Sequence, residues 1–287
     1  DRLDFVERKP PLVFEEIDFT VHNPELLAIR LAGPLEYAQR VEHLVGVTHM
    51  ETLMPRRTPQ VERFLVQWTI DELGHAEALG HLMEMVGLDP VPLDGVGPPT
   101  RNATIGRAGR MSASLHAVIE TIWATSGAMN EHLAMSAYHR IDAILKDAGE
   151  HALHETLFRR LRAHESAHKS FYATYATERW ASLRGWQQRL ARGVLRRTWA
   201  PVGATEAADR PAFARTVVAL AADDWQETLV ADVQSIAERI MDAAGEMGPF
   251  VEQAVRLTLE SDPAGEELLA RLWRRGLQPL APAWVRL

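Results

Sequence analysis

Two Glu-x-x-His motifs stand where a helix would turn its side chains inward. Glu72 and His75 lie in DELGHAEALGH (71–81), and Glu165 and His168 lie in LRAHESAHKSFY (161–172). Each pair interrupts a series of apolar residues with i, i+3/i+4 spacing, and a spacing of three places both members of a pair on the same helical face. Because a buried carboxylate without a partner is costly, two such helices that face each other need a cation between them.

Two further glutamates occupy mirror positions about the predicted helix turns. The turn near residue 57 lies 15 residues after Glu42 and 15 before Glu72, and the turn near residue 148 lies 17 residues after Glu131 and 17 before Glu165. Antiparallel helices joined by a turn bring such positions to the same height. A Glu-x-x-His motif alone is close to chance in this chain, so the mirrored arrangement carries the prediction of a shared site. Glu36 lies on another face of the first helix and is the second choice there.

Together these residues form a set of four carboxylates and two imidazoles: Glu42, Glu72, His75, Glu131, Glu165 and His168. Some four-helix bundles hold two iron or manganese ions with such a set, one Glu from each of two helices and Glu-x-x-His from each of the other two. Carboxylates neutralise hard cations, and each imidazole adds a neutral ligand. The chain has no cysteine, which excludes thiolate zinc sites and disulfides. The ligand types suit two Fe ions and a Mn/Fe pair equally.

Neighbouring residues suggest further roles. Asp71, one turn before His75, is expected to accept the other N–H of that imidazole, unless it is a solvated acid. The small residues Ser-Gly-Ala at 126–128 are expected to leave room for a pocket beside Glu131. Three tyrosines could be radical or proton-relay groups or could simply fill the core: Tyr138, Tyr172 and Tyr175.

Periodic apolar stretches predict the helices that position these residues. The four main helices are expected at 34–54, 59–86, 108–146 and 150–180, with Pro34 in the first turn of the first helix. The breakers PRRTP (55–59) and DAGE (147–150) predict tight turns, and residues 88–103 predict a long Pro/Gly-rich connection. Residues 1–32 are expected to lie over the outside of the core.

A helix pair, a long crossover and a second helix pair predict an all-α fold, a four-helix bundle over about residues 34–180. Further helices are expected at 186–197, 210–243, 248–260 and 264–275. They form a C-terminal extension over about residues 186–287 that packs on the bundle or presents a partner surface. The whole chain, 1–287, is expected to fold as one helical domain.

On these residues the chain resembles the ferritin-like diiron carboxylate proteins. Glu42, the DELGH stretch, Glu131 and ESAH (165–168) follow that family's order E, ExxH, E, ExxH, over about residues 34–180. The spacing is similar to that of the soluble acyl-carrier-protein desaturases and related O2-activating oxygenases. The resemblance implies a ferritin-like bundle, two iron ions, O2 as a substrate and an external electron donor.

The motifs also depart from the family's pattern. Many oxygenases of this class carry Asp directly before the ligating Glu and Arg directly before the His. Asp71 fits this pattern, but Gly74 and Ala167 stand where Arg is usual, and His164 stands where Asp is usual. Leu161 occupies the position of a third His in the N-oxygenase branch, which argues against that branch. These departures leave the reaction open among hydroxylation, desaturation and other oxidations.

The charge of the chain is unevenly distributed. The net charge is −8, yet residues 156–199 carry nine Arg and one Lys against two Glu, or +8, which leaves −16 elsewhere. The arginines from Arg159 to Arg197 are expected to dock an acidic carrier protein or electron donor, or to form a solvated face; nucleic-acid binding is not expected. No apolar run reaches the roughly 18–20 residues of a membrane span. A cytoplasmic location is expected, and a homodimer is one of the oligomeric states left open.

Three functions follow from these observations. The first is an oxidase, oxygenase or desaturase for a small organic or acyl substrate, since more than 100 residues beyond the bundle could shape a substrate pocket. The second is a ferroxidase or another iron- or manganese-handling protein. The third is a non-catalytic helical scaffold in which the motifs are coincidental.

Overall fold

The computed structural model describes residues 6, 9, 11–48, 58–92, 112–205, 207, 209–220, 224 and 226–274. Within these residues every regular element is helical and no strand is present, which confirms the predicted all-α class. None of the helices in this part of the chain is both long and apolar enough to cross a membrane.

The first helix pair consists of α2 (Pro24–Thr48) and α4 (Pro59–Met85). α4 begins where the Thr58 hydroxyl accepts a hydrogen bond from the backbone N–H of Val61 at 3.2 Å, with Pro59 in the first turn. Its bounds match the predicted helix at 59–86.

α2 begins ten residues earlier than predicted. Pro34, the expected first-turn residue, lies inside the helix, and the helix starts at Pro24. Leu27 and Leu31 are fully buried, so this first part packs into the core instead of lying over it. Pro34 has no N–H and removes one helical hydrogen bond. Burial of the two leucines, at about 1.5–3 kcal/mol each, offsets that loss.

The second helix pair is joined by a tight turn. α6 (Ala113–Asp147) begins at the N-cap Ser112, and Gly149 adopts a φ of +81°, a left-handed conformation that lets the chain reverse after α6. The returning segment consists of α7 (His151–Leu153), a π-helical turn η2 (His154–Phe158) and α8 (Arg159–Ser182). It matches the prediction at 150–180, whereas the predicted start of α6 at 108–111 lies outside the described residues.

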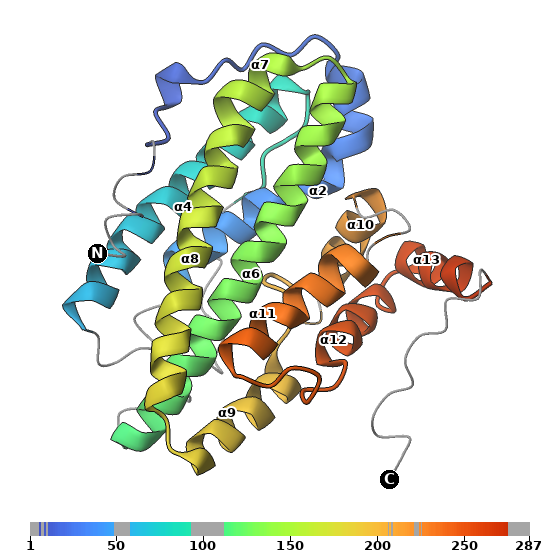
Figure 1. Cartoon of the computed structure of the whole chain (residues 1–287). Coiled ribbons are helices and arrows are strands. Elements are labelled where there is room, and N and C mark those ends of the chain that lie inside the picture. Colours follow the sequence, from blue (N-terminus) through green and yellow to red (C-terminus); the bar gives the residue numbers. More distant parts are fainter. Residues whose placement is uncertain are drawn as a thin grey trace.

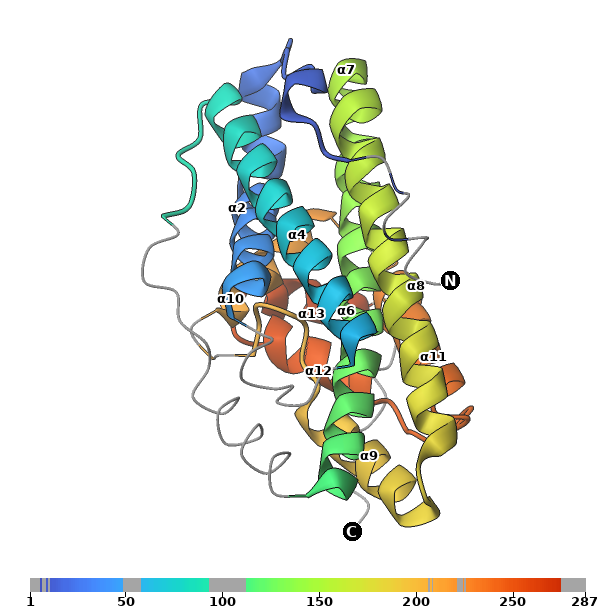
Figure 2. The same cartoon turned by 90° about the vertical axis from the view of Figure 1, so that its left-hand side faces the viewer.

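These four long helices pack side by side as a bundle (Figure 1), with α2 against α4 and α6 against α8. Viewed from the side, α4 ends and α6 begins at opposite ends of the bundle (Figure 2). The two helix ends that the predicted long crossover joins are therefore far apart along the bundle. Most of that connection lies outside the described residues.

The C-terminal part packs against one flank of the bundle, on α2 and α6 (Figure 1). Its elements are α9 (Gly185–Thr198), α10 (Arg210–Leu220), the π-helical segment η4 (Gln226–Ala231), α11 (Asp232–Ile240), α12 (Phe250–Leu259) and α13 (Pro263–Arg274). The prediction of a single helix over 210–243 is wrong: α10 packs on α2, and α11 packs on α6 and α8. A single straight helix could not pack on α2 and also on α6 and α8. Before the bundle, a 3₁₀ turn, η1 (Phe14–Glu16), interrupts the N-terminal segment.

Candidate metal centre

The six predicted ligand residues meet in the middle of the bundle. Each of these residues is at most 7% exposed, although four of them are acidic. They form two groups in which one ligand atom per residue lies within 4.8 Å of all the others: Glu42, Glu72, His75 and Glu165, and Glu72, Glu131, Glu165 and His168. Glu72 and Glu165 belong to both groups. The cluster can therefore hold a metal ion at either of two adjacent positions.

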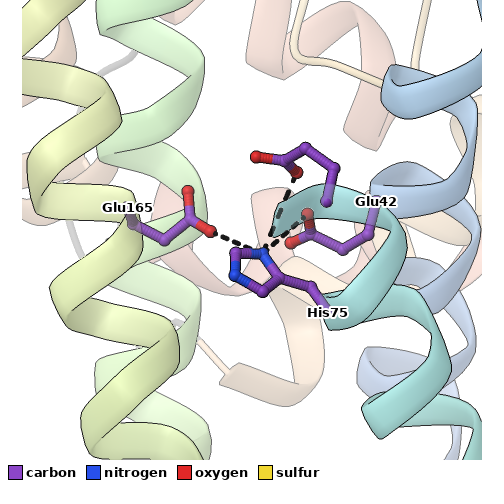
Figure 3. A group of neighbouring side chains, drawn as sticks. Glu42, His75 and Glu165 are labelled. Atoms are coloured by element: carbon purple, nitrogen blue, oxygen red, sulfur yellow. Dashed lines mark ion pairs between the residues drawn. The ribbon is translucent and has the colours of Figure 1, made fainter. Parts of the chain in front are cut away.

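Around the first position, the carboxylates of three helices converge on one imidazole nitrogen (Figure 3). His75 Nδ1 lies 3.2 Å from Glu165 Oε1, 3.5 Å from Glu42 Oε2 and 4.0 Å from Glu72 Oε2. α2, α4 and α8 each contribute to this group, so the position depends on the assembled bundle.

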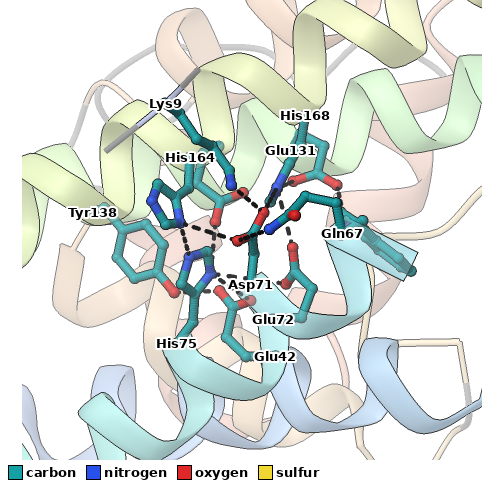
Figure 4. Close-up of polar contacts among 12 residues, drawn as sticks. Lys9, Glu42, Gln67, Asp71, Glu72, His75, Glu131, Tyr138, His164 and His168 are labelled. Carbon is teal, nitrogen blue, oxygen red and sulfur yellow. Dashed lines mark hydrogen bonds and ion pairs between the residues drawn. The ribbon is translucent and has the colours of Figure 1, made fainter. Parts of the chain in front are cut away.

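The second position has the same kind of surroundings (Figure 4). His168 Nδ1 lies 3.1 Å from Glu72 Oε1 and 3.8 Å from Glu131 Oε2. The two Nδ1 atoms thus face a common set of carboxylates from opposite helices, α4 and α8.

Four buried atoms of the cluster make no hydrogen bond: His75 Nδ1, His168 Nδ1, Glu72 Oε1 and Glu165 Oε1. The close approaches between nitrogen and carboxylate do not have hydrogen-bond geometry. Buried polar atoms are nearly always paired, and leaving one unpaired costs free energy. Here the unpaired atoms are of the types that coordinate iron and manganese, and they point into the same space. The donor set therefore fits a pair of divalent cations.

Burial and mutual repulsion raise the pKa of three of the glutamates. Burial is the largest cause for Glu72, Glu131 and Glu165, and the charge of a neighbouring glutamate is the next. For Glu42, burial also acts to raise the pKa, but the polar groups of Glu72 and His75 close to its carboxylate lower it to about 2. Four carboxylates in this space can all ionise only when positive charge lies among them. Two divalent cations would supply it.

The outer nitrogens of the two imidazoles have different partners. His75 Nε2 lies 3.0 Å from His164 Nδ1, and His168 Nε2 lies 2.9 Å from Asp71 Oδ2. If each Nδ1 faces a metal, each Nε2 carries the proton, so His75 donates to His164 and His168 donates to Asp71. The expectation that Asp71 supports His75 is wrong. Asp71 lies one turn before His75 on α4, but its carboxylate reaches across to His168 of α8.

Asp71 is itself held by two residues that the sequence did not single out (Figure 4). Lys9 Nζ lies 2.6 Å from Asp71 Oδ2, and Gln67 Nε2 donates to Asp71 Oδ1 at 3.1 Å. Burial acts to raise the pKa of Asp71, but the hydrogen bond from His168 and the charge of Lys9 lower it overall. Asp71 is therefore an anion. Gln67 could have been found from its i, i+4 spacing to Asp71, whereas no sequence signal points to Lys9.

Two aromatic side chains donate hydrogen bonds to the outlying glutamates. Trp68 Nε1 donates to Glu131 Oε1 at 3.0 Å, and the Tyr138 hydroxyl donates to Glu42 Oε1. Burial and the charge of Glu42 raise the pKa of Tyr138 well above its ordinary value, which keeps the phenol protonated as a donor. The sequence pattern suggested only core packing for Trp68. Its i, i+4 spacing to Glu72 on the inward face was the available signal.

Other predicted positions lie elsewhere. Glu36 is exposed, so only Glu42 of the two candidates on α2 reaches the cluster. The expected pocket beside residues 126–128 is filled: a Cβ on Gly127 would lie 2.5 Å from the ring of Tyr172, which occupies that space. Tyr175 donates to Glu120, away from the ligand set.

Comparison with known proteins identifies no relative. No protein-family model matches the chain, and neither the curated proteins nor the solved structures include a significant match. The resemblance to the diiron carboxylate proteins therefore rests on the motifs, and the candidate centre rests on its own geometry.

Proposed function

We propose that the protein is a dinuclear non-haem iron enzyme, with Mn/Fe as the alternative metal pair, that uses O2 to oxidise an organic substrate. The observation that carries the proposal is the set of four buried, unpaired ligand atoms on His75, His168, Glu72 and Glu165. A protein without a metal there would lose stability through every one of them. A scaffold function gives no reason for keeping such a set.

The residues divide into terminal and shared ligands. Glu42 and His75 would hold one ion, and Glu131 and His168 would hold the other. Glu72 and Glu165, which belong to both groups, would contact both ions and neutralise their charge together. Asp71 and His164 would fix the orientation of the two imidazoles, and second partners of this kind are important for metal affinity.

The bound ions would supply O2 reduction and substrate oxidation, and the protein supplies the setting. Hydroxylation consumes one O2, two electrons from a donor and two protons, and yields one hydroxyl group and one water. Desaturation removes two hydrogens from the substrate and yields two waters from the same inputs. Tyr138 keeps a proton on the oxygen that faces Glu42, and buried side chains such as Trp68 and Phe64 limit access of water.

The basic segment from Arg159 to Arg197 supports docking of an acidic partner, although only part of it is available. Arg160 pairs with Glu16, Arg162 with Asp142 and Arg179 with Glu120. On α9 and at its N-cap the exposed arginines are Arg184, Arg189, Arg196 and Arg197. We place the proposed contact with an acidic carrier protein or electron donor on α9.

The test is metal analysis combined with O2 consumption. Protein produced with both iron and manganese should contain about two ions per chain and should consume O2 when a reductant is added. Glu72→Ala and His168→Ala should each lose metal, whereas the exposed controls Glu77→Ala and His151→Ala should keep it. Metal retained by either ligand variant would sink the assignment, and less than about 0.2 ion per chain in the wild type would favour a scaffold.

Steady O2 uptake separates the enzyme from a ferroxidase. A ferroxidase consumes O2 in proportion to added Fe(II) and needs no organic molecule. The proposed enzyme should instead oxidise an organic substrate without net release or storage of iron.

A further inference from the structure

A cavity lies beside the candidate centre, and none of residues 126–128 lines it. It has a volume of about 90 Å³ and is bounded by α2, α6, α10 and η4 together with residues 201 and 202. Glu42 and Tyr138 form part of its wall. The cavity therefore borders a candidate ligand of the first metal position, whereas neither Glu131 nor His168 of the second position lines it.

The wall of the cavity is almost entirely apolar. Ala38 and Val41 of α2, Leu133 and Ala137 of α6, and Phe213 and Val217 of α10 all contribute to it. Among the described residues of the wall, Glu42 and Arg140 are the charged ones.

Both charges in the wall are already engaged. Arg140 Nη2 lies 2.5 Å from Asp224 Oδ2, and Glu42 accepts a hydrogen bond from Tyr138 and belongs to the candidate metal ligands. A charged ligand would find no free counter-charge among these residues, and transfer of a charge into such a space is costly.

The C-terminal part of the chain closes the cavity against the bundle. Arg40 of α2 pairs with Asp209 at 2.8 Å, and the Tyr37 hydroxyl donates to the carbonyl of Val202. These contacts fix the segment before α10 on α2. The cavity is thus held open between two parts of the chain that are tied together at its edge, and does not result from loose packing within the bundle.

We propose that this cavity binds the substrate, and that the substrate is an uncharged molecule with an alkyl chain whose oxidised carbon lies next to Glu42. The assignment of the substrate role rests on the proposed function. A charged group on the substrate would be disfavoured, because the wall is apolar and its two charged side chains are already paired. The volume selects against a ring: benzene binds in an engineered apolar cavity of about 150 Å³, whereas the end of an alkyl chain can enter a smaller space while the rest of the chain lies outside it.

Binding of three small probes to the metal-loaded protein tests the proposal. 1-Hexanol carries the alkyl chain without charge, hexanoate carries the same chain with a carboxylate, and benzyl alcohol carries a ring. Titration calorimetry gives the affinities, and the methyl NMR signals of Val41, Leu133 and Val217 report the location. We expect 1-hexanol to bind and shift these signals, and hexanoate and benzyl alcohol to bind at least about tenfold more weakly.

Three variants locate the site. Ala137→Phe should fill the cavity and weaken 1-hexanol binding at least about tenfold, whereas Ala143→Phe, at an exposed position of the same helix, should leave it unchanged. Leu229→Ala, at a half-buried position of the wall, should enlarge the cavity and strengthen benzyl alcohol binding. This gain cannot result from misfolding.

Metal content measured on the same samples separates the two proposals. If Ala137→Phe retains its metal and binds 1-hexanol as tightly as the wild type, the cavity is not the binding site, whereas the metal centre is still supported. Hexanoate binding as tight as that of 1-hexanol would overturn the uncharged class of substrate. If the protein takes up no metal but still binds 1-hexanol in the cavity, the proposed function is overturned and only the alkyl-binding site is supported.

Discussion

His164 Nδ1 lies 3.0 Å from His75 Nε2, whereas the corresponding nitrogen of His168 meets the carboxylate of Asp71. One imidazole of the centre is therefore supported by another imidazole and the other by a carboxylate. An anionic acceptor makes an imidazole a stronger donor to a metal than a neutral acceptor does. The two metal positions should differ in affinity even though their direct ligands are of the same types.

Replacement of His164 tests this difference. His164→Ala removes the acceptor of His75, and we expect metal affinity at the position of Glu42 and His75 to fall about 10- to 100-fold. Stepwise metal titration would show one weakened site and one unchanged site. His151→Ala, an exposed histidine outside the cluster, is the control. Equal weakening of both sites would contradict the pairing seen in the structure.

Replacement of Asp71 should weaken the other position. Asp71→Asn preserves the size of the side chain but removes the charge that His168 and Lys9 share, so the affinity of the position of Glu131 and His168 should fall about 10- to 100-fold. The same titration measures it. Glu77→Gln, on the exposed side of α4, should change neither site.

Metal removal should make stability depend on pH. Burial, and then repulsion among the carboxylates, raises the pKa of Glu72, Glu131 and Glu165 in the folded chain. A raised folded pKa means that the folded state holds more protons than the unfolded state. The stabilisation is complete below the unfolded pKa of about 4.3 and is lost as pH rises through the folded values.

The chelator-treated protein should accordingly melt at a lower temperature at pH 8 than at pH 5.5, and added metal should reverse the loss at pH 8. Thermal unfolding followed by circular dichroism at matched ionic strength is the measurement. A melting temperature of the metal-free protein that rises between these pH values would disprove the electrostatic account of the cluster.

Gly127 should tolerate no larger residue. Because Tyr172 occupies the space where a Cβ would lie, Gly127→Ala should cost about 1–3 kcal/mol of unfolding free energy. Gly33, also helical, has no atom within 4 Å of an added Cβ, so Gly33→Ala should be neutral or stabilising by about 0.5–1 kcal/mol. Urea unfolding of both variants compares them directly.

The exposed arginines of α9 should dominate contact with an acidic partner. The double variant Arg189→Glu, Arg196→Glu should bind an acidic acyl carrier protein at least about tenfold more weakly, and wild-type binding should weaken with salt. Arg159→Glu, at the far end of α8, should have little effect. Surface plasmon resonance at two salt concentrations is sufficient.

The grouping of the six candidate ligands could be predicted from the sequence because two simple regularities determine it. Helical periodicity placed Glu72, His75, Glu165 and His168 on inward faces, and the symmetry of a hairpin placed Glu42 and Glu131 opposite them. Neither regularity depends on predicting the exact first and last residues of the helices. The predicted start of α2 was wrong by ten residues, yet the side chain of Glu42 lies at the predicted level of the bundle and on the predicted inward face.

What the sequence did not reveal depends on how the helices are rotated and on contacts far apart in the chain. The partner of Asp71 is set by the rotation of α4 relative to α8, which periodicity alone does not define. Lys9 reaches Asp71 from 62 positions away. The cavity lies beside Glu42 because α10 packs on α2, and the space next to Gly127 is filled by Tyr172. Neither contact can be predicted from a local sequence pattern.

The wall contributed by α10 and η4 has an evolutionary consequence. All six candidate ligands lie between residues 42 and 168, whereas this part of the cavity wall lies after residue 200. Substitutions in the later stretch can reshape the cavity without altering a single ligand. A lineage of such proteins could change the molecule it acts on while inheriting its metal chemistry intact, and chimeras joined near residue 200 offer a direct way to engineer the same change.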